Sequence, residues 1–149
     1  MMGKFEKDTG AGRFFKDFKK YHGLPVQDAI FFNQSDLICD MAKHEDFIVM
    51  GRCADVVLTN HHIPHISIFI TESFDQRVRR MMEINSLNYK QAEHLLKKLD
   101  KRHERYYHAY TGKKWGDAVN YDLCIDSASY GIEESVELIE RMINKYPNS

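Results

Sequence analysis

The stretch VMGRCAD, residues 49–55, places a glycine, an arginine and an acid directly after a hydrophobic run. An arginine can hold a phosphate or a carboxylate through two parallel hydrogen bonds, and an aspartate can accept a hydrogen bond from a base or a sugar. A glycine lets a ligand approach the backbone closely. These residue types predict an anion-binding site at Gly51, Arg52 and Asp55. A turn closed by an Arg52–Asp55 ion pair fits the same residues equally well, so the motif alone leaves both interpretations open.

A second group of cations lies in LLKKLDKRHERYYHAYTGKKW, residues 95–115. Its members crowd neighbouring positions of one helix: Lys97, Lys98, Lys101, Arg102 and Arg105. Such a stripe suits a phosphate ligand, although a charge run considered alone is more often a solvated helix face. The interleaved tyrosines and Trp115 allow a third interpretation, which is stacking on the bases of a single-stranded nucleic acid. Arg77, Arg79 and Arg80 form a smaller group that can contact phosphate or cover the rim of a sheet.

Three further motifs carry weaker signals. Cys53 lies beside Arg52, which can lower a thiol pKa, but no partner histidine for a nucleophile is identifiable. The stretch NHHIPH, residues 60–65, lacks a cysteine or acid at ligand spacing, so it predicts a polar loop and no metal site. DTGAGR, residues 8–13, has no preceding strand and no GK[ST] ending, and it therefore does not qualify as a phosphate-binding loop.

The elements that must position these residues alternate between strands and helices. Three short apolar segments rich in β-branched or aromatic residues predict buried strands: FIVMG (47–51), HISIFIT (65–71) and YDLCIDS (121–127). Strands separated by helices require crossover connections, which indicates an α/β fold with a mostly parallel sheet. Ligands of such sheets bind beyond the carboxyl ends of the strands. Gly51, Arg52 and Asp55 would emerge at that edge if FIVMG is a strand.

Helix signals fill the intervals between these segments. Apolar spacing predicts a helix from Pro25 to Lys43, and a last helix that carries Ile132, Val136, Ile139 and Ile143. Ser73 with Gln76, and Asn88 with Gln91, predict the starts of two more helices through capping boxes. The second of these should be long and should end at Gly112.

Composition bounds the class of protein. The 149 residues suit one domain, and a formal net charge of -1 with a pI near 6.7 offers no basic excess that would indicate nucleic acid or an anionic membrane. The three cysteines have no CxxC spacing and are odd in number, which argues against a disulfide framework. The sequence contains no signal-peptide pattern and no apolar run long enough to span a membrane, so we expect a cytoplasmic protein.

Taken together, VMGRCADVVL, then HISIFI followed by RVRRMM, then DKRHERYYHAYTGKKWGD followed by NYDLCIDS, resemble the cytidylate kinase-like family of P-loop nucleoside-monophosphate kinases. The resemblance runs from about Tyr21 to Tyr146. It implies an ATP- and Mg²⁺-dependent transfer of the γ-phosphoryl group to CMP or a related small acceptor. By this resemblance, Gly51, Arg52, Asp55 and Arg77 bind substrate. Lys101, Arg102 and Arg105 belong to a mobile lid that stabilises charge on the transferring group.

The sequence departs from the family at its beginning. Nothing before Tyr21 resembles the strand, glycine-rich phosphate loop and helix with which family members open. We therefore expect one incomplete domain over residues 1–149, a P-loop-kinase-like three-layer fold that is truncated at its N-terminus, with residues 1–20 as a flexible lead. Removing a central strand opens the sheet, so either FIVMG pairs directly with HISIFIT or a second copy supplies strands in a homodimer.

Two alternatives to a working kinase follow from this departure. A non-catalytic descendant would keep the acceptor pocket, or only a scaffold surface, after the loss of the ATP-binding half. A small RNA- or single-strand-binding module would use the Lys/Arg/Tyr block instead, and its binding would fall steeply with salt.

Overall fold

The computed structural model describes residue 21 and residues 23–145 of the 149-residue chain. The chain divides into two compact units, residues 1–64 and residues 65–149, and each is described by itself. In the part of the chain that the structure describes, no helix is long and apolar enough to cross a membrane.

The described part of the first unit contains two helices joined by an extended segment. Helix α2 spans Val26–Met41 and helix α3 spans Ala54–Asn60. Ile38 of α2 and Ala54 and Leu58 of α3 form a buried cluster. The cluster brings the turn at the start of α3 against the end of α2, and so it fixes where residues 51–55 emerge. The helix predicted from Pro25 to Lys43 is confirmed, whereas α3 was not predicted.

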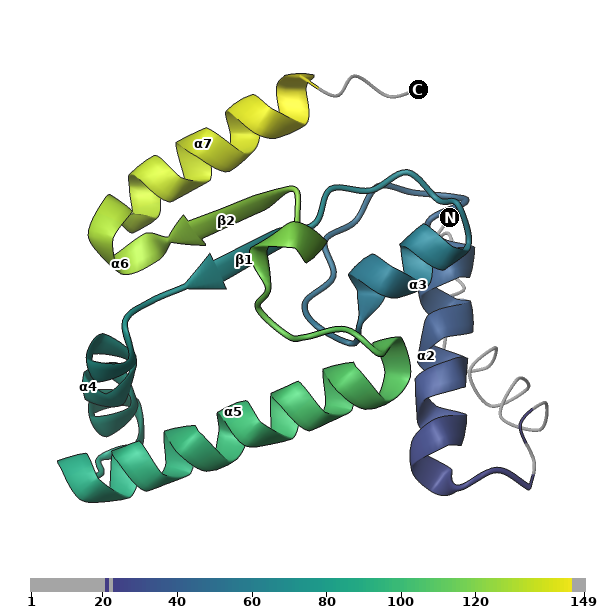
Figure 1. Ribbon diagram of the computed structural model, residues 1–149. Helices are drawn as coiled ribbons and strands as arrows, with labels where there is room; N and C mark the ends of the chain where they lie inside the picture. Colours follow the sequence, from purple (N-terminus) through teal and green to yellow (C-terminus); the bar gives the residue numbers. More distant parts are fainter. Residues whose placement is uncertain (1–20, 22, 146–149) are drawn as a thin grey trace, which may run out of the picture. The chain divides into compact units, whose positions relative to one another are not determined.

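The second unit is built on a two-stranded parallel sheet. Strand β1, Ile68–Thr71, pairs with strand β2, Leu123–Asp126, in the register Ile68↔Leu123 to Thr71↔Asp126 (Figure 1). Just before the strands, the backbone N–H and the hydroxyl of Ser67 both donate to one carboxylate oxygen of Asp122, each at 2.8 Å. This double contact fixes the register of the pair. Two of the three predicted strands are therefore confirmed.

Helices α4, Phe74–Asn85, and α5, Tyr89–Thr111, follow β1 and pack against each other (Figure 1). Both predicted starts are confirmed: the Ser73 side chain accepts from the N–H of Gln76, and Asn88 and Gln91 form a complete capping box. The α4–α5 contact buries Val78 and Ala92 completely and leaves Leu96 3% exposed. These capped, tightly packed helices are a rigid base for the side chains that they carry.

Three further helical elements complete the described part of this unit. They are the 3-10 turn Ala118–Asn120, helix α6 at Ser127–Tyr130, and helix α7 at Ile132–Lys145, which confirms the predicted last helix. Asp126, at the end of β2, caps α6 by accepting hydrogen bonds from the backbone N–H groups of Ala128 and Ser129. The Ser129 hydrogen bonds lower the pKa of the Asp126 carboxyl.

The prediction that FIVMG is a strand is wrong. Residues 45–50 carry no strand assignment, and the sheet has two strands, so direct pairing of FIVMG with HISIFIT is also wrong. The segment nevertheless alternates like a strand: Phe47 and Val49 pack on the cluster of the first unit, while Ile48 and Met50 are 94% and 89% exposed. Apolar composition predicted a buried strand, but every second side chain here is exposed, and a strand also needs a hydrogen-bonded neighbour.

The architecture is thus a helix-rich α/β fold with a small parallel sheet. The three-layer P-loop-kinase-like arrangement and the single-domain organisation remain predictions. Residues 1–20, expected to be a flexible lead, lie outside the described residues.

Candidate functional site

The turn before α3 presents Arg52 in an uncommon backbone conformation. Gly51, Arg52 and Cys53 all adopt left-handed φ angles, of 71°, 61° and 54°. Glycine tolerates this region, but it costs other residues roughly 1–2 kcal/mol each. Strain of this kind persists where the surroundings enforce it, and it concentrates at functional sites.

The buried residue Cys53 holds the strained turn in place. Cys53 is 4% exposed, and its carbonyl accepts the N–H of Val57 at 2.9 Å to start α3. Arg52 is exposed, and within the described residues its guanidinium has no ion-pair partner. The turn is therefore not closed by an Arg52–Asp55 pair, which was the alternative interpretation of the motif. Asp55 follows in the first turn of α3 and is partly buried.

The Cys53 thiol is not activated by its neighbour. Burial, and then the Asp55 carboxylate, raise the pKa of Cys53 to about 11, which is the opposite of the lowering that a nucleophile requires. Burial also raises the pKa of Cys39, whereas the Cys124 side chain is exposed on β2.

We therefore expect Cys124 to be alkylated first. Near pH 8 a thiol of pKa about 11 is almost entirely protonated and unreactive, so Cys53 labelling should become fast only as the pH rises toward 11. Iodoacetamide labelling followed by mass spectrometry from pH 7 to pH 10 measures this order, and Cys124→Ser should remove the fast phase. Fast labelling of Cys53 in the folded protein at pH 7 would contradict the burial seen here.

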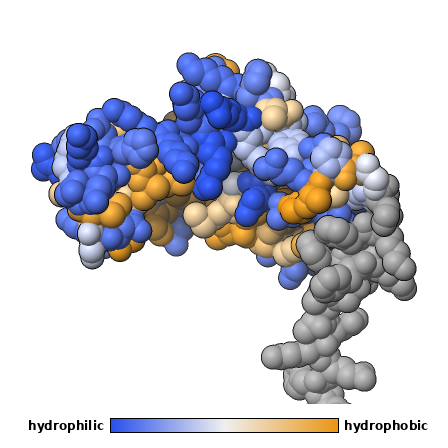
Figure 2. Space-filling model, turned by 90° about the horizontal axis from the view of Figure 1, so that it is seen from below, coloured by the Kyte–Doolittle hydropathy of each residue, from blue (hydrophilic) through white to orange (hydrophobic). Residues whose placement is uncertain are grey.

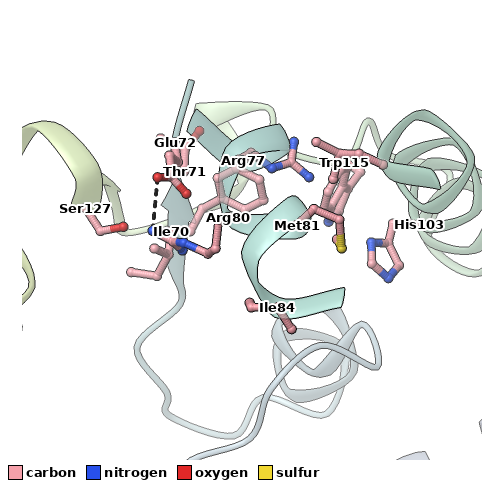
Figure 3. A pocket seen from close by; sticks show the side chains of 12 residues that line it. Ile70, Thr71, Glu72, Arg77, Arg80, Met81, Ile84, His103, Trp115 and Ser127 are labelled. Carbon is pink, nitrogen blue, oxygen red and sulfur yellow. Dashed lines mark hydrogen bonds and ion pairs between the residues drawn. The ribbon is translucent and has the colours of Figure 1, made fainter. Parts of the chain in front are cut away.

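A pocket of about 360 Å³ lies in the second unit, beside the end of β1. Apolar side chains line much of it, and three of its polar side chains come from α4 and α5: Arg77 and Arg80 from α4, and His103 from α5 (Figure 3). Glu72 and Thr71 at the end of β1 and Ser127 after β2 also line it. The pocket therefore sits at the carboxyl ends of two parallel strands, where ligands of α/β sheets bind.

Each pocket arginine is held by a carboxylate. Arg77 forms a two-bond fork with Asp100 of α5, with nitrogen–oxygen distances of 3.0 and 2.5 Å. Arg80 donates to Glu72 at 3.0 Å, the contact drawn as a dashed line in Figure 3. The two cations are thus locally balanced, and a ligand meets oriented donors rather than a strong net positive charge.

An aromatic cluster closes one side of this pocket. The Trp115 ring lies edge-on to Phe69 of β1 at 5.5 Å between centroids, and it contacts the ring of His103 at 5.3 Å. Gly116 has a φ of 73°, and a Cβ atom there would lie 3.0 Å from the Phe69 ring. Glycine is therefore needed both for the turn and for the close approach of the ring.

The predicted catalytic cations lie on α5 outside the pocket lining. Lys101, Arg102 and Arg105 are exposed, and none of them makes an ion pair within residues 21 and 23–145. Lys97, in the same stripe, pairs with Glu93 at 2.7 Å. The helix places the three cations within two turns of one another, but the structure alone gives them no ligand.

The predicted site residues are divided between the two units. Arg77 belongs to the second unit and is bonded to Asp100 of α5, the helix that also carries Lys101, Arg102 and Arg105. Gly51, Arg52 and Asp55 belong to the first unit. Sequence reasoning missed Glu72, Asp100 and His103. Each is a polar residue within a helix or at a strand end, and its role depends on a partner distant in the sequence.

The described residues offer no metal site of their own. No group of three or more His, Cys, Asp or Glu side chains that could hold a metal ion occurs among residues 21 and 23–145. His61, in NHHIPH, contacts the Val57 carbonyl oxygen through Nδ1 at 2.8 Å in the turn after α3.

Comparison with known proteins supplies independent evidence. Residues 1–129 match the cytidylate kinase-like family. The chain is also similar to the crystal structure of an uncharacterized protein from Eubacterium ventriosum ATCC 27560, with 30% sequence identity and a TM-score of 0.69; the match covers 93% of this chain and 77% of that one. No curated protein matches the chain.

Proposed function

Because the chain belongs to the cytidylate kinase-like family, we propose that it binds a nucleoside monophosphate, CMP or a related small acceptor, for transfer of the γ-phosphoryl group of ATP. The family relationship supports kinase-related chemistry in general. The acceptor, the donor and the residues assigned below are our proposal.

The observation that carries this proposal is the strained turn at residues 51–53. Two consecutive non-glycine residues in the left-handed region are costly, and the turn holds an exposed arginine without an ion-pair partner among the described residues. Arg52 is therefore available for the phosphate of the acceptor, while Gly51 lets it approach the backbone and Asp55 accepts a hydrogen bond from its base or sugar.

For the second unit, considered by itself, the proposal assigns a separate set of cations. Arg77, at the wall of the pocket, offers guanidinium donors to a phosphate. Lys101, Arg102 and Arg105 stabilise the negative charge that spreads over the phosphate oxygens during transfer. Phosphoryl transfer depends mainly on positioning and on such stabilisation, so the reaction does not require a strong general base.

The described residues fit part of a nucleotide such as ATP better than they fit Mg²⁺. The pocket, with its apolar walls, Trp115 and two oriented arginines, fits part of a nucleotide. The described residues form no cluster for a metal ion, so we assign no step to Mg²⁺. When bound with a nucleotide, the ion supplies neutralisation of phosphate charge.

Calorimetric titration with CMP, followed by ATP with Mg²⁺, tests this proposal. Saturable CMP binding with formation of CDP supports a kinase, and CMP binding without turnover supports the non-catalytic descendant. No nucleotide binding together with strongly salt-dependent binding of a single-stranded oligonucleotide would instead support the RNA-binding alternative.

We further propose that a second copy of the chain covers the exposed extended segment. Figure 2 shows apolar patches among the hydrophilic surface of one face. Segment 45–50 adds exposed apolar surface, because Ile48 and Met50 are almost fully exposed. Among the described residues, this segment has no strand partner. Unpaired extended backbone with apolar side chains favours pairing with another chain.

The double variant Ile48→Lys/Met50→Lys should therefore weaken self-association at least tenfold. Lysines disfavour edge-to-edge pairing because they place like charges against each other and solvate the edge. Sedimentation equilibrium measures the association constant, with Val119→Lys as a control at another exposed apolar residue, 86% exposed. A wild-type chain that is monomeric at high micromolar concentration would rule out the homodimer.

A further inference from the structure

Arg77 reaches the pocket with one side of its guanidinium already bonded. Nη1 donates to Oδ2 of Asp100 at 3.0 Å, and Nη2 donates to Oδ1 at 2.5 Å. Arg77 lines the pocket, whereas Asp100 is not among the lining residues. A guanidinium has five N–H donors, so this fork leaves the Nε–H and the two outer Nη hydrogens for a ligand.

The helix packing fixes the fork in place. Val78, next to Arg77, is fully buried, and Leu96, one turn before Asp100, is 3% exposed. Together with Ala92 they form the α4–α5 cluster. The Arg77 and Asp100 side chains are themselves only 31% and 20% exposed. The ion pair thus joins two helices whose separation is set by buried side chains.

The other arginines of α4 are held more loosely. Arg80 makes a single contact with Glu72, and its side chain is 53% exposed. Arg79 pairs with Asp75 outside the pocket, and both side chains are more than half exposed, at 71% and 52%. Arg77 differs from both because it combines a two-bond fork, partial burial and a place in the pocket wall.

We propose that Asp100 is a positioning residue that holds the guanidinium of Arg77 at the pocket wall, with its remaining donors available to an anionic group of the nucleotide. The inference rests on the proposed function, because it takes nucleotide phosphate as the ligand. It assigns a role to Asp100 that does not require Asp100 to touch the ligand.

The direction in which Asp100→Asn changes ligand affinity distinguishes a positioning role of Asp100 from an effect of its negative charge alone. A carboxylate near an anion site repels the ligand, so if Asp100 acted through its charge alone, Asp100→Asn would tighten binding. If Asp100 holds Arg77, the same variant weakens binding because the guanidinium is free to leave the pocket wall.

CMP titration of the full chain tests this sign. We expect Asp100→Asn and Asp100→Glu to weaken CMP binding about five- to tenfold. Asp100→Glu keeps the negative charge but lengthens the side chain by one methylene. It therefore tests the same positioning role if Asp100→Asn does not fold. The control, Asp75→Asn, removes the same charge from the Arg79 pair outside the pocket and should stay within twofold of wild type. CMP binding by both Asp100 variants that equals or exceeds wild type would overturn the proposal.

An NMR readout without ligand separates this inference from the proposed function. The resonance of the Nη hydrogens of Arg77 that bond to Asp100 should be shifted and protected from exchange in the wild-type chain, and should lose both properties in Asp100→Asn. If wild type binds no CMP, the proposed function fails, and this resonance decides whether Asp100 holds Arg77. An Arg77 resonance that is unchanged by both Asp100 variants overturns the positioning role.

Discussion

Arg52→Ala should weaken CMP binding by roughly 10- to 100-fold while leaving the fold intact. A hydrogen bond to a charged group contributes about 1.5–3 kcal/mol, and about 1.4 kcal/mol is tenfold in affinity, so a net loss of one such bond on truncation gives this range. Arg52 is exposed and has no ion-pair partner among the described residues, so its removal breaks no internal contact of that kind. Isothermal titration calorimetry measures the affinity, and circular dichroism checks the fold.

Two further variants test whether the loss of CMP affinity reflects phosphate binding by the Arg52 guanidinium. Arg52→Lys keeps the charge but cannot form the fork, so it should recover only part of the affinity. Arg141→Ala removes another exposed arginine, whose side chain is 76% exposed, and should leave CMP affinity unchanged. If Arg52→Ala binds CMP like wild type, the turn at residues 51–55 is not the acceptor site.

Leu96→Ala should destabilise the second unit by about 3 kcal/mol. Leu96 is 3% exposed and packs with Val78 and Ala92, so truncation leaves a cavity in the most buried cluster of this unit. In a chain of this size, such a loss lowers the melting temperature by about 6–12 °C. Thermal unfolding followed by circular dichroism measures the shift.

The neighbouring exposed position provides the comparison. Lys98→Ala, two residues further along α5, should change stability by less than about 0.5 kcal/mol because its side chain lies in solvent. Equal melting temperatures for Leu96→Ala and wild type would show that α4 and α5 do not pack as described.

The helices were predictable because their signals are local. The Asn88–Gln91 capping box and the glycine after Thr111 bound α5 as predicted, since a cap bonds to backbone groups within one turn. The α4–α5 core was partly predictable from the spacing of Ala92 and Leu96. Tyr107 is buried whereas its neighbour Tyr106 is only partly buried, because a difference of one residue turns a side chain by 100° around the helix.

FIVMG shows where local reasoning fails. Its apolar composition predicted a buried strand, and Phe47 and Val49 do pack on a core, but strand formation depends on hydrogen bonds to a second segment. The short helix α3 was missed because its start is a strained turn at Cys53 rather than a capping residue, and no side chain caps it.

The sequence by itself determined the family, the α/β class, the two strands of the sheet and the predicted helices. These features depend on residue types and on spacing within a few positions, whereas the exposure of Arg52 and the absence of an Arg52–Asp55 pair came from the structure. Only the tertiary structure decided that FIVMG is unpaired, that burial raises the pKa of Cys53, and that Asp100 rather than a ligand engages one edge of Arg77. The physical reason is the same in each case: burial, strand pairing and ion pairing join residues that are distant along the chain, and their geometry exists only once the chain is packed.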